Sequence, residues 1–331
     1  MKRILKTATT NRHAVITMDG AIGRWELSNV VEGKSPATIK WYKEIVGTFQ
    51  GYLRNKYQRD DLSMFNKDVV MEYILYLRQR PKYEGHPYTP RQCKLLSAKT
   101  VQCHIRALKA LSSWLYREGY TVDNRLVNLK LPKAPVKVLE PLTSDEVKVI
   151  ISSMQKGSSN DIRNRAIVVT ALDTGLRASE IAGITLGNVN LDAGYIKVMG
   201  KGSKERIVPI GKYVQKVLWS YVTDTRSRLA AGEYDNLFLS RSGKPITVNT
   251  IKLLFSRLAK TSGVVRLHAH LCRHTFAIDY LLNGGDAFSL QAILGHTSLE
   301  MVRNYVHFNR SQIIFQHHKY SPVDKLQNLG A

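Results

Sequence analysis

Hydrophobic residues recur at spacings of three and four along the first third of the chain, with polar residues between them. This spacing places the apolar side chains on one side of an α-helix and predicts amphipathic helices. Serines typical of helix starts precede two of these segments, Ser35 before Pro36 and Ser97 before Ala98. One predicted helix begins near Thr38. Two further helices are predicted over 66–80 and 98–117.

Three other segments lack this pattern. Residues 1–30 are weakly patterned, and residues 81–90 contain three prolines and a glycine, which is typical of a loop. Residues 131–141 contain three prolines and two lysines, and we interpret them as an extended linker between two domains. The predicted division is a tail 1–17, a helical domain 18–128, a linker 129–141, a second domain 142–320 and a tail 321–331.

After the linker, helical and alternating segments are mixed. Thr143 and Glu146 have the spacing of a helix capping box. Residues 195–199 and 206–210 alternate as short strands do, with a turn between them, and 237–239 is a candidate third strand. Helices are expected near 160–174, 212–231, 248–262, 273–283, 287–294 and 299–305. The sequence therefore predicts a mainly α fold with a small antiparallel β-sheet.

Charge narrows the class of partner. Lys and Arg number 49 against 26 Asp and Glu, a formal net charge of +23 over 331 residues. This balance favours nucleic acid over its alternatives, an acidic protein partner or a charge that serves solubility. No apolar run is long enough for a membrane span, and residues 1–11 lack the apolar core of a secretory signal. Cys93, Cys103 and Cys272 form no disulfide framework, so we expect a cytoplasmic protein.

One face of the predicted helix 98–117 is basic. Its members lie at offsets 0, 3, 7 and 10, opposite the apolar stripe. Such a ridge is usually a solvated face, but residues 91–140 hold ten Lys or Arg against three Asp or Glu. We therefore predict DNA contact by the ridge, which consists of Lys99, Gln102, Arg106 and Lys109.

An arginine follows the predicted helix 160–174 in the sequence Thr-Gly-Leu-Arg-Ala-Ser-Glu. The glycine ends one helix, and the next begins at Arg177, with Glu180 one turn further on. An arginine oriented by a carboxylate is suited to two-pronged phosphate binding. A structural ion pair at the surface is the alternative.

A second group lies at residues 268–274. His270 and Arg273 are three residues apart, so one helical turn can direct both at one phosphate. The alternative is a metal site, because His268, Cys272 and His274 add further ligand types. No second Cys/His pair stands at finger-like spacing, which favours packing or capping roles for His268 and His274.

Three further residues carry little information when taken singly. Lys201 lies in the predicted turn between the strands, with Lys204 as its alternative. His296 stands at a helix joint after Gly295, where a histidine is usually a packing residue. Tyr305 lies in a helix, where most tyrosines belong to the core or the surface.

In their order along the chain, these segments resemble the boxes of the tyrosine recombinase, or phage integrase, family in its Xer-like form. The resemblance extends over about residues 18–315 and rests on five boxes: T-G-L-R-x-S-E, G-K-G-x-K-E-R, H-x-L-R-H, L-G-H and the tyrosine followed by x-H. Many relatives have another small or polar residue where this chain has Cys272. The matching residues are Arg177 with Glu180, Lys201, His270, Arg273, His296 and Tyr305.

The resemblance implies a site-specific DNA recombinase that forms a 3′-phosphotyrosyl intermediate through Tyr305. It implies that the two box arginines stabilise the transition state and that His270 helps to remove the tyrosine proton. Lys201 would protonate the leaving 5′-oxygen, and His296 would bind a phosphate oxygen and support the tyrosine. No metal, ATP or other cofactor is expected.

The resemblance also implies how the protein works on DNA. The helical domain and the catalytic domain would form a clamp around double-stranded DNA, and a homotetramer would join two sites. An accessory recombinase or a directionality factor is a candidate partner, and Ile313, Ile314 and Phe315 are candidates for docking on a neighbouring subunit. The outcome would be integration, excision or resolution of a mobile element or replicon. The alternatives are a type IB topoisomerase and a catalytically silent DNA-binding regulator.

Overall fold

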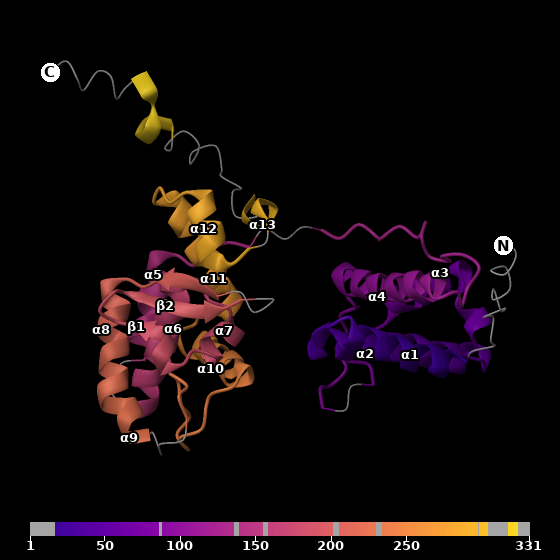
Figure 1. Ribbon diagram of the computed structural model, residues 1–331, viewed down its shortest axis with the longest axis horizontal. Helices are drawn as coiled ribbons and strands as arrows, with labels where there is room; N and C mark the ends of the chain where they lie inside the picture. Colours follow the sequence, from indigo (N-terminus) through magenta and orange to yellow (C-terminus); the bar gives the residue numbers. More distant parts are fainter. Residues whose placement is uncertain are drawn as a thin grey trace, which may run out of the picture. The chain divides into compact units, whose positions relative to one another are not determined.

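The computed structural model describes residues 17–85, 88–135, 139–154, 158–200, 205–229, 234–296, 298–303 and 317–323. The chain divides into two compact units, residues 1–137 and 138–331 (Figure 1). The division falls inside the proline-containing segment 131–141. Among the described residues, no helix combines the length and apolar character needed to cross a bilayer.

The N-terminal unit is a bundle of helices in which α4 packs against α1, α2 and α3. The side chains of Ser35, Asn66 and Ser97 each accept a hydrogen bond from a backbone N–H in the first turn of their helix, as expected from their types. The predictions of three helices in this unit are confirmed. Its elements are α1 (Met18–Val31), α2 (Pro36–Tyr57), the 3₁₀ turn η1 (Leu62–Met64), α3 (Lys67–Gln79) and α4 (Ala98–Arg117).

Helix α1 was not predicted from the sequence. It buries Met18, Ala21 and Trp25 at spacings of three and four, and Thr17 caps its first turn. Its outer side is not uniformly polar, because Leu27 and Val30 are exposed. Apolar residues outside the buried stripe obscure its spacing, which explains why the pattern of 1–30 is weak.

The C-terminal unit places a small sheet among helices (Figure 1). Helix α6 lies at the centre of this unit and packs against both α8 and α11. The bounds of the helices are α5 (Ser144–Ser152), α6 (Ser159–Thr174), α7 (Ala178–Ala182), α8 (Lys212–Ser220), α9 (Ser227–Leu229), α10 (Val248–Thr261), α11 (Ala269–Leu282), α12 (Ala287–Leu294) and α13 (Leu299–Arg303). Strands β1 (Val189–Asn190), β2 (Tyr195–Met199) and β3 (Glu205–Pro209) form an antiparallel sheet in the order β1-β2-β3.

The prediction of a mainly α fold with a small antiparallel sheet is confirmed, but its third strand was wrong. Among the described residues, 237–239 makes only isolated bridges, by way of Leu239 and the neighbouring Asn236. The third strand is β1, whose two residues are too few to show an alternating pattern. The helix expected over 212–231 is interrupted by a π-helical turn, Tyr221–Arg226.

A glycine lets the segment after α6 lie close to α11 and α12, and an arginine fixes the end of the linker. Gly175 ends α6 with φ +62°, a conformation that favours glycine. A Cβ there would lie 2.6 Å from Phe276 Cδ1 and 2.8 Å from Leu294 Cδ2, so only glycine permits this approach. Arg266 fixes the end of the linker, because its NH2 donates to Pro141 O (2.9 Å) and to Glu146 Oε2 (2.6 Å).

Candidate active site

A pocket of about 480 Å³ opens where the segment before α7 meets the first turns of α10 and α11. The pocket is cationic, because two arginines and a lysine line it together with two histidines, of which one, His270, is held neutral by its surroundings. Its complete lining is Leu176, Arg177, Ala178, Ser179, Val248, Lys252, His268, Ala269, His270 and Arg273. Residues nearly 100 positions apart in the sequence therefore share one cavity, and three of them are residues singled out by the boxes.

Arg273 forms the floor of this site. Its side chain is only 1% exposed. NH1 donates to Gly175 O and NH2 donates to Leu294 O, both at 2.8 Å. NH2 also lies 2.8 Å from His296 Nε2. Because a buried guanidinium needs partners for its donors, these contacts fix Arg273 and tie together the ends of α6 and α12.

Arg177 occupies a more open position, with its side chain 39% exposed. Its NH1 donates to Glu180 Oε1 at 2.9 Å, which confirms the predicted i,i+3 pair. To the described residues, Nε and NH2 donate no hydrogen bond. Two nitrogens of the fork, Nε and NH2, can therefore donate to a ligand in the pocket.

Glu180 has a second partner that sequence reasoning missed, Arg206 on β3. Arg206 NH1 and NH2 donate to Glu180 Oε1 and Oε2, each at 3.0 Å, which is two-pronged pairing. Burial raises the pKa of Glu180, but the hydrogen bonds from Arg206 and from the backbone of Arg177 outweigh it, so this pKa lies below its ordinary value. The only sequence signal for Arg206 is its place at the end of the G-K-G-x-K-E-R box.

His270 and His296 are held in their neutral forms. Burial, and then the charge of Arg273, lower the pKa of His270 below its ordinary value of 6.5. The same causes lower the pKa of His296 to about 4. Because a guanidinium only donates, His296 Nε2 accepts from Arg273, and the ring hydrogen of the neutral form belongs on Nδ1.

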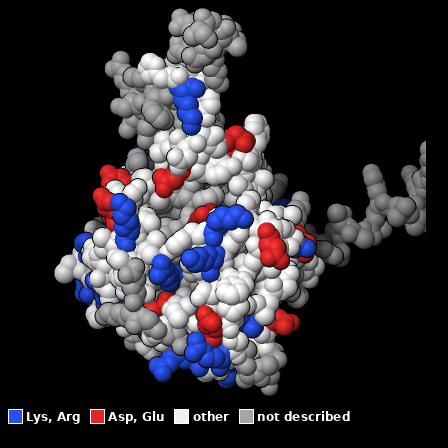
Figure 2. Space-filling model, turned by 90° about the vertical axis from the view of Figure 1, so that its left-hand side faces the viewer, with Lys and Arg blue, Asp and Glu red and all other residues white. Residues whose placement is uncertain are grey.

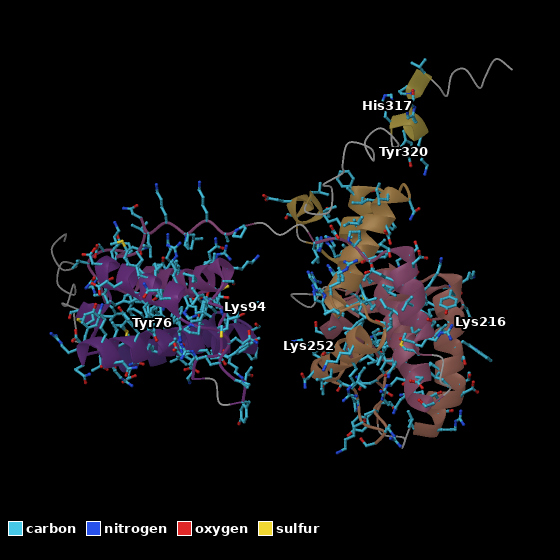
Figure 3. All side chains as sticks on the ribbon, turned by 180° about the vertical axis from the view of Figure 1, so that it is seen from behind. Tyr76, Lys94, Lys216, Lys252, His317 and Tyr320 are labelled. Atoms are coloured by element: carbon cyan, nitrogen blue, oxygen red, sulfur yellow. The ribbon has the colours of Figure 1, made fainter. Side chains whose placement is uncertain are left out.

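Lys252 also lines the pocket and was missed by sequence reasoning. It is an exposed residue in the second turn of α10, in a segment for which the sequence predicted a helix and no functional residue. Figure 3 shows Lys252 and Lys216 on opposite sides of the C-terminal unit. Lys252 thus adds a cation on the pocket side of this unit.

The alternative of a metal site at 268–274 is not supported by the side-chain positions. His268 Nδ1 accepts the backbone N–H of Leu271 (2.8 Å) and caps α11, as predicted. His274 Nε2 contacts Leu139 O, and Cys272 is fully buried, which raises the pKa of its thiol to about 12. Within the described ranges, no three His, Cys, Asp or Glu side chains gather as metal ligands.

Three of the singled-out positions, Lys201, its alternative Lys204 and Tyr305, lie outside the described residues. Described elements flank them. Strand β2 ends at Met199 and β3 begins at Glu205, so both lysines lie in the sequence between two paired strands. Helix α13 ends two residues before Tyr305.

The basic ridge of α4 is partly engaged within its own unit. Gln102 Nε2 donates to Pro132 O at 2.6 Å. Lys109 Nζ donates to Val127 O (3.0 Å) and Leu129 O (2.9 Å). Lys99 and Arg106 are exposed. The ridge therefore divides into two residues that hold the chain leading to the linker and two that face solvent.

Basic residues form separate groups on the visible face of the C-terminal unit, without a continuous basic surface (Figure 2). On the side of the C-terminal unit that Figure 2 shows, Lys and Arg form several small groups with Asp and Glu between them. Positive charge on this side is thus divided into local groups, and the pocket is one defined place in the C-terminal unit where cations converge.

Comparisons with known proteins agree on one family. A sequence model of the phage integrase family matches residues 140–312. Tyrosine recombinase XerD of Halalkalibacterium halodurans is 26% identical over 286 residues, 86% of this chain and 91% of that protein. Tyrosine recombinase XerD of Staphylococcus aureus strain Mu50 is 29% identical over 295 residues, 88% of this chain and 95% of that protein.

A solved structure supports the fold independently. The XerH site-specific recombinase, in a post-cleavage complex with its palindromic difH substrate, matches with a TM-score of 0.67. The match covers 88% of this chain and 82% of that chain at 21% sequence identity. The similarity therefore includes segments from both units.

Proposed function

Because this chain belongs to the phage integrase family and is a site-specific tyrosine recombinase of the Xer-like type, we propose that it cuts DNA through a covalent 3′-phosphotyrosyl link at Tyr305. The observation that carries the proposal is the pocket in which Arg177, His270 and Arg273 meet. Phosphoryl transfer is catalysed mainly by positioning and by stabilising charge on the phosphate, and this pocket supplies both.

Each step of cleavage has a candidate residue. The Tyr305 oxygen attacks phosphorus, and the bond from phosphorus to the 5′-oxygen breaks. His270, held neutral by its surroundings, accepts the tyrosine proton. Lys201 gives a proton to the leaving 5′-oxygen. In the reverse step, the freed 5′-hydroxyl of a partner duplex attacks the phosphotyrosine, so strands are exchanged without hydrolysis.

The other box residues hold the phosphate. Arg177 offers Nε and NH2, which donate to no described residue, and Arg273 adds a fixed positive charge at the floor of the pocket. His296, next to Arg273, directs its Nδ1–H toward a phosphate oxygen or Tyr305. These charges neutralise the transition state, so the proposed mechanism uses no metal, and the phosphotyrosine conserves the bond energy without ATP.

DNA is the substrate, and we assign its contacts to both units. Lys99 and Arg106 on α4 and Lys252 at the pocket are exposed cations suited to phosphates. Gln102 and Lys109 act by holding residues 127–132 that lead into the linker. The proposed clamp has a core-binding domain at 18–128, a linker at 129–141 and a catalytic domain at 142–320.

At the level of assembly, we propose a homotetramer on two recombination sites at the nucleoid. Residues Ile313, Ile314 and Phe315, which lie outside the described residues, would dock on a neighbouring subunit. The proposed outcome is integration, excision or resolution of a mobile element or replicon, with an accessory recombinase or directionality factor as a further partner. The Xer relatives do not favour the alternative of a type IB topoisomerase.

The nucleophile is tested by Tyr305→Phe on a nicked suicide substrate that traps the covalent complex. The variant lacks the attacking oxygen but keeps its surface, so covalent complex should be absent while DNA binding changes little. Gel analysis of protein–DNA adducts measures the first quantity, and a binding titration measures the second. Tyr320→Phe is the matched control and should be trapped like the wild type. Normal trapping of Tyr305→Phe would falsify the assignment.

A further inference from the structure

Arg206 joins three segments that the site needs. It lies at the second position of β3, five residues after Lys201 in the sequence. Its NH1 and NH2 hold both oxygens of Glu180, and its Nε donates to Ile293 O at 2.7 Å. The side chain is only 11% exposed. One guanidinium therefore connects strand β3, the carboxylate that pairs with Arg177, and helix α12, which precedes His296.

The joint before His296 is built around this guanidinium. Gly295 ends α12 with φ +63°, and a Cβ at this position would lie 3.1 Å from Cζ, Nε and NH1 of Arg206. The absence of a side chain lets Arg206 lie directly against the backbone of the L-G-H box. The glycine of this box thus has a packing role in addition to its conformational one.

The charges around Glu180 explain why one arginine would not suffice. The Glu180 side chain is 7% exposed, and its two oxygens accept from Arg177 NH1, from the Arg177 backbone N–H and from both ends of Arg206. With Arg177 alone, the buried carboxylate would neutralise Arg177 and draw its fork inward. With Arg206 present, two guanidiniums share one carboxylate, which leaves a net positive charge.

We propose that Arg206 is a positioning residue that takes up the charge of Glu180 and so keeps Arg177 charged and directed at the scissile phosphate. This role rests on the proposed function, because it acts through the phosphate contact of Arg177. Arg206 acts through its ion pair with Glu180. It does not itself line the pocket.

Charge sharing makes a prediction that simple packing does not. In Arg206→Met, Glu180 falls on Arg177 alone, and single-turnover cleavage of the suicide substrate should slow by about 100-fold, the scale expected for a misplaced clamp. Adding Glu180→Gln removes the excess negative charge, so the double variant should cleave about tenfold faster than Arg206→Met. Arg206→Lys keeps the charge but loses the fork, and an intermediate rate is expected.

Arg226→Met is the matched control. Arg226 is also a buried arginine that donates to two carbonyl oxygens, Asn236 O and Tyr234 O, but it does not line the pocket. Thermal melting of all variants measures any loss of folding. The control should lose stability and keep its cleavage rate per folded molecule.

The outcomes separate this inference from the proposed function. If wild-type protein forms no covalent complex on the suicide substrate, the proposed function fails. If the wild type is trapped but Arg206→Met cleaves at the wild-type rate per folded molecule, only the role of Arg206 is overturned. A double variant no faster than Arg206→Met overturns it too, because added destabilisation without rescue is what a purely structural residue gives. When Arg206→Met does not fold, Arg206→Lys with and without Glu180→Gln decides in the same way.

Discussion

The two box arginines, Arg177 and Arg273, have different environments, although the family boxes suggest the same phosphate-binding role for both. Arg273 is enclosed and holds Gly175 O, Leu294 O and His296. Arg177 is exposed at the pocket and is held by one carboxylate. Arg273 therefore fixes the frame of the site, and Arg177 is the more adjustable contact. A substitution at Arg273 should reduce folding stability as well as cleavage, whereas one at Arg177 should act mainly on cleavage.

The neutral state of the histidines leads to a pH dependence. The pKa of His270 lies below 6.5, so the ring can accept the tyrosine proton throughout the neutral range. At subsaturating DNA, where the profile reports the free protein, cleavage should stay constant as pH falls toward 6.5 and decrease only below it. His270→Gln should remove this acidic limb. A wild-type rate that already halves above pH 7 would contradict the assignment of His270 as the base.

The lowered pKa values of His270 and His296 also make folding stability depend on pH, and their direction determines how. The pKa values of His270 and His296 are lower in the folded protein than the ordinary 6.5 of an unfolded chain. Below that pH the unfolded chain binds more protons than the folded one, so the free energy of unfolding decreases as pH falls. Acidic assays of cleavage therefore need a parallel measurement of the folded fraction.

At the scale of elements, local signals were predictable and long-range ones were not. Ser97 and Thr143 act within one helical turn, and both caps are confirmed. The Arg177–Glu180 pair is likewise local. The Arg206–Glu180 pair joins residues 26 positions apart, and only the folded chain brings them together. Lys252 enters the pocket through the packing of α10 beside α7, which no spacing reveals.

Two exposed cations on different helices, Arg106 on α4 and Lys252 on α10, are expected to contact DNA phosphates. Replacing either with Gln should weaken binding to a half-site and reduce the slope of log affinity against log salt by about 0.9, the value for one phosphate contact. Salt titrations of binding by fluorescence anisotropy measure both quantities.

The matched controls for this experiment are Lys40→Gln on α2 and Lys216→Gln on α8, each of which removes one exposed positive charge. Figure 3 shows Lys216 on the side of its unit opposite to Lys252. The controls should keep the wild-type slope. Equal slopes for all four variants would mean that the charge acts only through the net field of the protein.

At the scale of the whole molecule, the division into two compact units and the presence of 49 basic against 26 acidic residues are what the proposed clamp around DNA requires. The pocket lies wholly in the C-terminal unit, and the exposed ridge cations lie in the other. Binding and cleavage should therefore be separable: substitutions on α4 should change affinity, while substitutions of Arg177, His270 or Arg273 in the pocket should change the rate of bound complexes.

The central claim is covalent catalysis by Tyr305, and the identity of the linked residue tests it most directly. Wild-type protein trapped on the suicide substrate is digested with nuclease and protease, and the remaining adduct is located by tandem mass spectrometry. The proposed mechanism predicts a nucleotide joined through its 3′-phosphate to the peptide that contains Tyr305. A nucleotide on another side chain, such as Tyr280 or Tyr320, or a link through a 5′-phosphate, would contradict it.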